Sequence, residues 1–521
     1  MWSSSKARVR CWGLLVVLTV ACGGDDDTGA DGGGTDAMAD ATIDSGADGA
    51  MPDGGTDGAS PDGGATDGGG GVLPGCMAPQ HLWELVLSVG SGDAMDAEIK
   101  VTASAALPGG AFALGGHTVR GTVDLGDGST VTGDPPTGFV AVYEADGSLR
   151  WKKIGGLGYP VSALATSGDG STIAALQDSE VYFYAASDGS VQGSWAPSAA
   201  DASSYAYVRA FAPASGGWLI GGSFAGTVDF GGGDRSTPST AVEPLAPFVV
   251  KLSGTSHDWD WFQAGDGELD KAEVTGIAEL TDGTVVAVGR ALAAGAAGGH
   301  FDLGSAGSFG PGPFRVVLSP TGSPTQAGTL FGSDETGGVP QVVSGAGGYV
   351  LAIPFSSSLM LDASTTVSLM GGNAFVVAAF DGSHSLQWHK ALLPADGMGI
   401  VNLGAVSAGH GLVVVGGSLF EEDVTVDGVT LLAEGMRTDA FVLALDATDG
   451  SAQWGRTFSG AGDEAVLTAV ALSDGDILAG GMFGAAGPSI PGGPVDFGDG
   501  PKDPNGSAGF AVRYGCPGSG M

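Results

Sequence analysis

Close variants of Asp449-Gly-Ser-Ala-Gln-Trp454 recur along the chain and set its repeat period. In each variant, a turn of the Asp-Gly type is followed within a few residues by Trp. One copy has lost its Trp, and Ala327 stands in its place. The resulting positions divide the chain into seven units, mostly of about 60 to 70 residues, which is a period typical of repeat architectures. They are Trp83, Trp151, Trp195, Trp261, Ala327, Trp388 and Trp454.

Each unit also contains a second turn between two apolar runs, as at Leu107-Pro-Gly-Gly110 and Thr281-Asp-Gly283. The flanking runs are rich in Val, Ala and Leu, which predicts a hairpin of two buried strands. A third apolar run, such as residues 441–446, precedes the Asp-Gly turn, and the run that bears Trp is the fourth. The sequence therefore predicts four strands per unit and no long helix.

Four strands repeated seven times are typical of a β-propeller, in which each blade packs on its neighbours. An open β-solenoid is the alternative. The first unit begins with a fourth-strand pattern at residues 81–87, and the last ends with a third-strand pattern at residues 510–514. We therefore expect an all-β, seven-bladed β-propeller over residues 76–516, closed by its N-terminal strand and followed by a tail at residues 517–521.

The cysteines support a closed ring. The chain has four Cys, of which Cys76 and Cys516 stand at the two ends of the expected propeller. In an exported protein, a disulfide between them is the simplest arrangement, and two free thiols are the alternative. A Cys76–Cys516 bond requires neighbouring termini, which a propeller provides and a solenoid does not.

Residues 1–21 have the pattern of a secretory signal, with a basic start and an apolar run too short to span a bilayer. The run ends in Leu18-Thr-Val-Ala-Cys22, which resembles the lipobox of bacterial lipoproteins, although Thr19 departs from the usual Leu. This resemblance implies that Cys22 carries a lipid. An ordinary cleaved signal is the alternative. We expect a lipid-anchored protein at the outer membrane or cell surface.

Residues 22–75 repeat short motifs of Asp, Gly, Ala, Thr and Pro and contain almost no apolar side chains to bury. This composition predicts a disordered tether between the lipid and the folded part. Its Asp-Gly words lack the ligand spacing of an EF-hand calcium loop. The tether is therefore not expected to bind metal.

The net charge excludes one class of partner. The chain has 58 acidic and 19 basic residues, for a net charge of -39. Binding to nucleic acid needs clustered Lys and Arg to displace counterions from the phosphates, and a strongly acidic chain is repelled instead. A nucleic-acid-binding function is therefore not expected.

Two resemblances bear on the repeats. The segment from Ala444 to Trp454 resembles the tryptophan-docking repeat of quinoprotein-like (PQQ-like) propellers, and Gly222-Ser-Phe-Ala-Gly-Thr-Val-Asp-Phe-Gly231 looks like the repeat of secreted propeller lipoproteins common in myxobacteria and their relatives. Both resemblances imply that the tryptophan side chains fill the gaps between blades. These are Trp83, Trp151, Trp195, Trp261, Trp388 and Trp454. Quinoprotein dehydrogenases hold their cofactor with adjacent cysteines, which this chain lacks, so a quinone cofactor is not expected.

An acidic residue recurs in the same loop of most units. The loop after the fourth strand carries an acidic residue in six units, at Asp93, Asp201, Asp266, Asp334, Asp396 and Asp463. Several stand beside Gly, which is typical of Asx turns. The alternative is a ring of carboxylates around one mouth of the propeller, which would suit calcium. The candidate metal ligands are Asp93, Asp266, Asp334 and Asp463.

No catalytic motif is recognisable, and no catalytic residue is assigned. We expect a monomeric, non-enzymatic scaffold that binds a protein or glycan, with no cofactor unless calcium occupies the mouth. The alternatives are an enzyme, a lyase or hydrolase with its site in the channel, and an outer-membrane assembly lipoprotein that helps to insert barrels.

Overall fold

Four-stranded antiparallel sheets with meander order repeat along the chain. The computed structural model describes residues 79–515 except 88–97, 120–121, 133–135, 155–158, 238–244, 255–256, 268–270, 293–299, 331–337, 346, 485–492 and 505–506. The expected signal, Cys22, the tether, Cys76 and Cys516 therefore lie outside the described residues. No helix in the described part is long and apolar enough to cross a membrane.

The strands fall into four classes by their order within a sheet. The first strands are β2 (Glu98–Ala106), β8 (Val161–Thr166), β13 (Tyr205–Ala214), β20 (Lys271–Glu279), β26 (Gln341–Gly345), β32 (Ile400–Gly409) and β38 (Ala465–Ala471). The second strands are β3 (Phe112–Val119), β9 (Thr172–Gln177), β14 (Gly217–Ala225), β21 (Val285–Leu292), β27 (Gly348–Phe355), β33 (Leu412–Phe420) and β39 (Ile477–Gly484). The third strands are β6 (Thr137–Tyr143), β10 (Glu180–Ala185), β17 (Ala246–Ser253), β24 (Gly312–Leu318), β30 (Ala374–Asp381), β36 (Thr438–Asp446) and β42 (Ser507–Gly515). The fourth strands are β7 (Leu149–Ile154), β11 (Val191–Trp195), β18 (Trp259–Ala264), β25 (Pro324–Thr329), β31 (Leu386–Leu392), β37 (Ala452–Phe458) and β1 (Gln80–Leu87).

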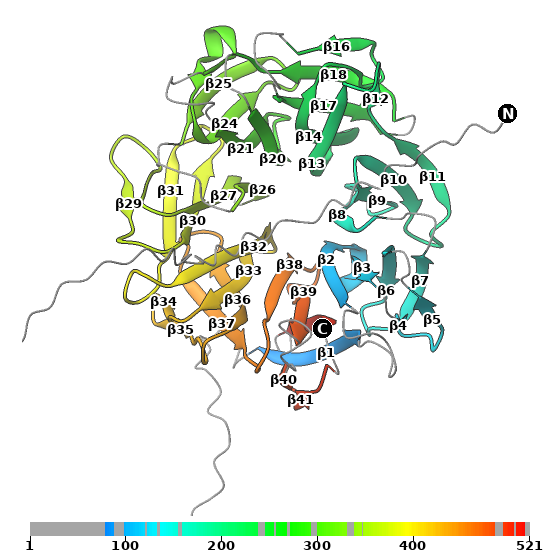
Figure 1. Cartoon of the computed structure of the whole chain (residues 1–521), viewed down its shortest axis with the longest axis vertical. Helices are drawn as coiled ribbons and strands as arrows, with labels where there is room; N and C mark the ends of the chain where they lie inside the picture. The colour runs from blue at the N-terminus through cyan, green and yellow to red at the C-terminus, as the bar shows by residue number, and fades with distance from the viewer. Residues whose placement is uncertain are drawn as a thin grey trace, which may run out of the picture. The chain divides into compact units, whose positions relative to one another are not determined.

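The first strands close a ring. Each packs against the first strand of the next sheet, from β2 through β8, β13, β20, β26 and β32 to β38, and β38 packs back against β2. Figure 1 shows these strands around the centre, with the fourth strands outside them. Second and third strands are buried on both faces, as in the fully buried 440–445 of β36. A closed ring of four-stranded sheets is the architecture of a β-propeller.

The ring closes where the two ends of the described chain meet. The early strand β1 pairs antiparallel with β42, from Gln80↔Gly515 to Leu87↔Gly509, as the sequence patterns predict. Buried Arg513 adds a second connection across this joint. Its Nε donates to Asp476 Oδ2 at 2.8 Å, and its Nη1 donates to the carbonyls of Gly110 at 3.0 Å and Ala145 at 2.7 Å. One side chain thus ties the last sheet to both turns of the first complete sheet.

Short extra hairpins interrupt most connections between second and third strands, and the sequence analysis missed them. They are β4 (Thr122–Asp124) with β5 (Thr130–Thr132), β15 (Thr227–Asp229) with β16 (Asp234–Ser236), β22 (Phe301–Asp302) with β23 (Ser308–Phe309), β28 (Ser358–Met360) with β29 (Thr366–Ser368), β34 (Val424–Val426) with β35 (Val429–Leu431) and β40 (Val495–Asp496) with β41 (Pro501–Lys502). Two-residue strands β12 (Ser198–Ala199) and β19 (Asp266–Gly267) extend the second and third of these hairpins.

The recurring Val-Asp-Phe-Gly motif builds two of these hairpins. Asp229 Oδ1 accepts hydrogen bonds from the amides of Gly231 at 2.7 Å and Gly233 at 2.9 Å. Asp496 repeats the arrangement with Gly498 and Gly500. Each Asp therefore orders its own turn, while its apolar neighbours, such as Phe230, are buried.

The tryptophans dock on the next sheet. A Cβ added at Gly450, where φ is +74°, would lie 2.5 Å from the Trp388 ring, and Trp388 Nε1 donates to Ala447 O at 3.1 Å. The same relation joins Trp83 to Gly147, Trp151 to Gly189 and Trp261 to Gly322. The Gly of one Asp-Gly-Trp repeat thus makes room for the Trp of the preceding repeat, which explains why the two residues recur together.

Candidate functional site

The sheets present two different faces, which we call the turn face and the loop face. The turn face carries the tight turns between first and second and between third and fourth strands. The loop face carries the connections between second and third strands and those from a fourth strand to the next sheet. Parallel bridges Leu245↔Lys271 and Asn373↔Ile400 join such connections to the start of the following first strand.

Aspartates on the turn face accept hydrogen bonds within their own turns. Asp449 Oδ1, for example, accepts from the Ser451 amide at 2.8 Å. Such hydrogen bonds hold the pKa of these carboxyls below its usual range, to about 2 for Asp169. The turn aspartates with lowered pKa values are Asp146, Asp169, Asp188, Asp282, Asp381 and Asp449.

Large apolar side chains are exposed mainly on the loop face. Met370, Met436 and Met398 are 93%, 80% and 70% exposed, and Tyr159 and Leu292 also lie in or beside connections of this face. Met370 and Met398 belong to adjoining loops, because a Cβ at Gly397 would lie 3.6 Å from the Met370 Cβ. Exposed Met is favoured at binding surfaces because its flexible thioether adapts to different partners.

Acidic residues surround Met398. Asp396 Oδ1 accepts from the Met398 amide at 2.6 Å, and the Ala395 amide donates to Asp423 O at 3.0 Å, which connects two loops. The pKa of Glu422 is raised, because its surroundings desolvate the carboxyl and Asp396 and Asp423 lie close to it. The apolar Met398 therefore projects from a negatively charged surface.

Two carboxyl groups are fully buried near this face, between β36 and β38. Asp439 and Glu464 are both 0% exposed. Asp439 Oδ2 accepts from the Glu434 amide at 2.5 Å, but Asp439 Oδ1 and both Glu464 carboxyl oxygens accept no hydrogen bond of good geometry from a described residue. The nearby Gly460 and Gly484 amides offset the rise in the Glu464 pKa only in part. Burial, and for Glu464 the nearby Asp439, raise the pKa of Asp439 to about 6 and that of Glu464 to about 8.

The structure places the expected metal ligands as follows. Asp93 and Asp334 lie outside the described residues, and only the backbone of Asp266, in β19, is described. Asp463 Oδ1 lies 3.3 Å from Thr438 Oγ1, which donates to it, and 4.0 Å from Arg437 Nη1. Within the described ranges, no group of three or more His, Cys, Asp or Glu side chains could hold a metal ion. The calcium hypothesis therefore stays a prediction.

The other members of this acidic series form turns. Asp201 Oδ1 accepts from the Ser203 amide at 2.9 Å and from the hydroxyls of Ser203 and Ser204. Asp396 similarly accepts from the amides of Met398 and Gly399. The structure does not bring these carboxylates together with Asp463 through any described interaction.

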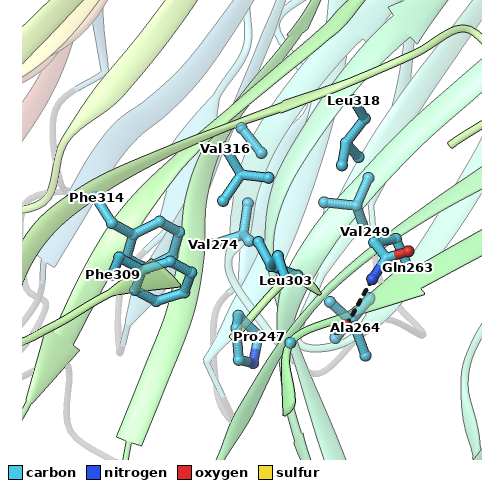
Figure 2. A pocket seen from close by; sticks show the side chains of 13 residues that line it. Pro247, Val249, Gln263, Ala264, Val274, Leu303, Phe309, Phe314, Val316 and Leu318 are labelled. Atoms are coloured by element: carbon cyan, nitrogen blue, oxygen red, sulfur yellow. Dashed lines mark hydrogen bonds between the residues drawn. The ribbon is translucent and has the colours of Figure 1, made fainter. Parts of the chain in front are cut away.

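A small apolar pocket lies between the sheets of β17 and β24 (Figure 2). Val274, Phe309 and Leu303 line it, and the only side-chain amide, that of Gln263, donates to Ala264 O at 2.7 Å. This pocket offers apolar contact and no titratable group. Sequence periodicity could not reveal it, because it forms between two sheets.

Comparisons with known proteins assign neither a family nor a function. No family model and no curated protein matches the chain. Solved structures that it resembles include BamB from Moraxella catarrhalis (11% identity, 84% of this chain and 99% of that one, TM-score 0.35), U3-55K (11%, 84% and 99%, TM-score 0.44) and the quinohemoprotein alcohol dehydrogenase from Comamonas testosteroni (11%, 84% and 76%, TM-score 0.37). Likenesses this distant do not assign a ligand.

Proposed function

We propose that the chain is a seven-bladed β-propeller that acts as a non-enzymatic binding scaffold for a protein or glycan, held at the cell envelope by a lipid on Cys22. The cyclic packing of the first strands from β2 to β38 supports seven blades. Tryptophan docking between sheets, as at Trp388 and Gly450, supports a rigid frame. A rigid frame that presents variable loops is a common basis for binding.

The exposure of Met370, Met398 and Met436 carries the proposal. Methionine side chains 70% to 93% exposed in loops of one face contribute little to folding. Their apolar surface becomes useful when a partner covers it, and the neighbouring Asp396, Glu421 and Glu422 would favour partners with basic or hydroxyl groups at that place.

Cross-linking in intact cells tests the binding function. The variant Met370→Ser, Met398→Ser, Met436→Ser should lose cross-linked partners while keeping its thermal stability. The matched control is Val191→Ser, which changes a residue that is 64% exposed on the turn face and should leave the partners unchanged. Equal cross-linking in both variants would contradict a loop-face scaffold.

The anchor has a separate test. Cys22→Ala should move the protein from the membrane fraction to the soluble fraction, because a lipid rather than an apolar helix would hold it there. Unchanged fractionation, together with no lipid mass on the N-terminal peptide, would contradict the lipid anchor and leave the binding function intact.

A further inference from the structure

A cluster of charged side chains lies near the loop-face ends of β20 and β21 and beside the middle of β13. Glu273 on β20 and Arg290 on β21 are cross-strand partners, and Arg290 Nε donates to Glu273 Oε1 at 2.7 Å. Arg209 from the neighbouring sheet approaches the other carboxylate oxygen, with its Nε 3.7 Å from Glu273 Oε2. One carboxylate therefore stands between two guanidinium groups.

A β-bulge places Arg209. The pairing of β13 with β14 shifts between Val208 and Ala210, so Arg209 is the bulged residue. Bulges recur at comparable points of other first strands, where they place Thr102 and Thr275. Those threonine hydroxyls donate to carbonyls of the next sheet, at 2.5 Å to Val161 and 2.7 Å to Pro340.

Arg209 differs from these threonines because its guanidinium donates no hydrogen bond to another described residue. Its side chain is 48% exposed, against 20% for Glu273. Bulges re-aim side chains and are frequent beside binding sites. In β2 and β20, the β-bulge places a threonine that donates to the next sheet. In β13, the β-bulge places a charged side chain that is exposed to solvent.

The cluster is locally positive in a chain whose net charge is -39. Within the described ion pairs of the cluster, Glu273 carries one negative charge, while Arg209 and Arg290 carry two positive charges. Among the described residues, Arg290 donates a hydrogen bond only through its Nε, and the Arg209 guanidinium makes only the longer ion pair with Glu273 and the contact with the Tyr207 ring. An arginine fork matches the geometry of a carboxylate.

Two aromatic rings border the cluster. The Arg209 guanidinium lies 5.3 Å from the Tyr207 ring centroid, and the rings of Tyr205 and Tyr207 are 5.2 Å apart with an angle of 56° between their planes. Both side chains are partly exposed. Tyrosine combines an apolar ring face with a polar end, which suits the C–H face and hydroxyl groups of a sugar.

We propose that Arg209 and Arg290, spaced by Glu273, bind the carboxylate of an acidic sugar whose ring packs against Tyr205 and Tyr207. This inference rests on the proposed binding function and names its ligand class. A long polyanion would place further negative charges over the acidic surface of the chain. Those charges would be repelled wherever they come within about one Debye length of it, roughly 8 Å at physiological salt, so long polyanions are disfavoured. The fitting ligand is a short glycan with one or a few uronate groups.

Calorimetric titration of the full chain with glucuronate tests the site, with glucose and inorganic phosphate as parallel probes. Glucuronate should bind, and glucose should bind about 10- to 100-fold more weakly, since it lacks the charged acceptor. Arg209→Gln should weaken glucuronate binding by a similar factor. Glu273→Gln should strengthen it, because it removes the competing carboxylate.

Arg235→Gln is the matched control, because Arg235 also lies over aromatic rings, 5.6 Å from the Trp259 centroid, but on a different hairpin. It should leave glucuronate binding unchanged. Absence of glucuronate binding, or equal binding by the Arg209→Gln variant, would overturn the site. Phosphate binding as tight as glucuronate would overturn the sugar component. The methionine-dependent cross-linking would stand under each of these results, so the two proposals fail separately.

Discussion

The turn face and the loop face both contain aspartates that order turns, but they differ in how their buried carboxyl groups are partnered. On the turn face, Asp449 and its equivalents accept backbone hydrogen bonds, and their pKa values are lowered. On the loop face, Asp439 and Glu464 are buried with unpartnered oxygens, and their pKa values are raised. Asp201 and Asp362 on the loop face also accept turn hydrogen bonds and have lowered pKa values. The difference therefore lies in the buried pair Asp439 and Glu464, which is held at a cost in free energy.

The largest expected effect is a pH dependence from Glu464. Its folded pKa of about 8 exceeds the ordinary value of 4.5, so between these values the folded state binds a proton that the unfolded state has lost. The free energy of unfolding should fall as pH rises through this range, by up to about 5 kcal/mol, and level off above it. Urea unfolding at pH 5, 6, 7 and 8 measures this decrease.

Glu464→Gln should flatten that decrease, because a neutral amide has no proton to lose. Asp439, with a pKa of about 6, contributes a smaller decrease of the same sign. The turn aspartates cannot mimic it, since their lowered pKa values remove stability only as pH falls toward about 2, as for Asp169. An unchanged slope in the Glu464→Gln variant would assign the effect to other groups.

Trp388→Ala tests the docking between sheets. The indole is 8% exposed and packs over Gly450, so its removal should lower the free energy of unfolding by about 3–5 kcal/mol. Chemical denaturation followed by circular dichroism measures the change. A loss below about 1 kcal/mol would show that the tryptophans do not hold adjacent sheets together.

Asp449→Ala removes one turn hydrogen bond on the turn face. A small loss in the free energy of unfolding is expected, because the exposed carboxylate no longer accepts from the Ser451 amide. Asp449→Asn should recover most of it, because the amide oxygen can still accept from Ser451. Equal losses in both variants would assign the effect to charge instead of the hydrogen bond.

Met370→Ala should have the smallest effect. The side chain is 93% exposed, so the free energy of unfolding should change by less than about 0.5 kcal/mol. Thermal and urea unfolding of the purified full chain provide the measurement. A larger loss would mean that Met370 packs against the protein and is not reserved for a partner.

The sequence predicts the sheets well because their determinants are local. Asp-Gly turns and alternating apolar runs locate four strands per unit, and the fourth-strand pattern at residues 81–87 predicts the pairing of β1 with β42. The hairpins at Asp229 and Asp496 were not predicted, because their strands are only two or three residues long, too short for a recognisable apolar pattern. The spacing from Asp229 to Gly231 and Gly233 was the available signal.

The candidate sites were less predictable because they join distant residues. Arg209 and Glu273 lie 64 positions apart and meet only when two sheets pack. Glu464 stands directly after Asp463, the residue selected as a metal ligand, but no sequence pattern distinguishes a buried carboxyl from an exposed one. Of the expected metal ligands, Asp463 alone has a described side chain, so that hypothesis awaits the calcium-dependent melting that would test it.

The comparison of the faces is tested most directly by measuring two glutamate variants side by side at pH 8. Glu279, on the turn face, is nearly buried and accepts from Lys251 Nζ at 2.8 Å, whereas Glu464 has no partner among the described side chains. We predict opposite effects on the free energy of unfolding: Glu279→Gln should lower it by roughly 3 kcal/mol, because Lys251 loses its counter-charge, and Glu464→Gln should raise it. Equal signs for the two variants would contradict the contrast between Glu279, a buried carboxylate with a counter-charge on the turn face, and Glu464, a buried carboxyl group held at a cost near the loop face.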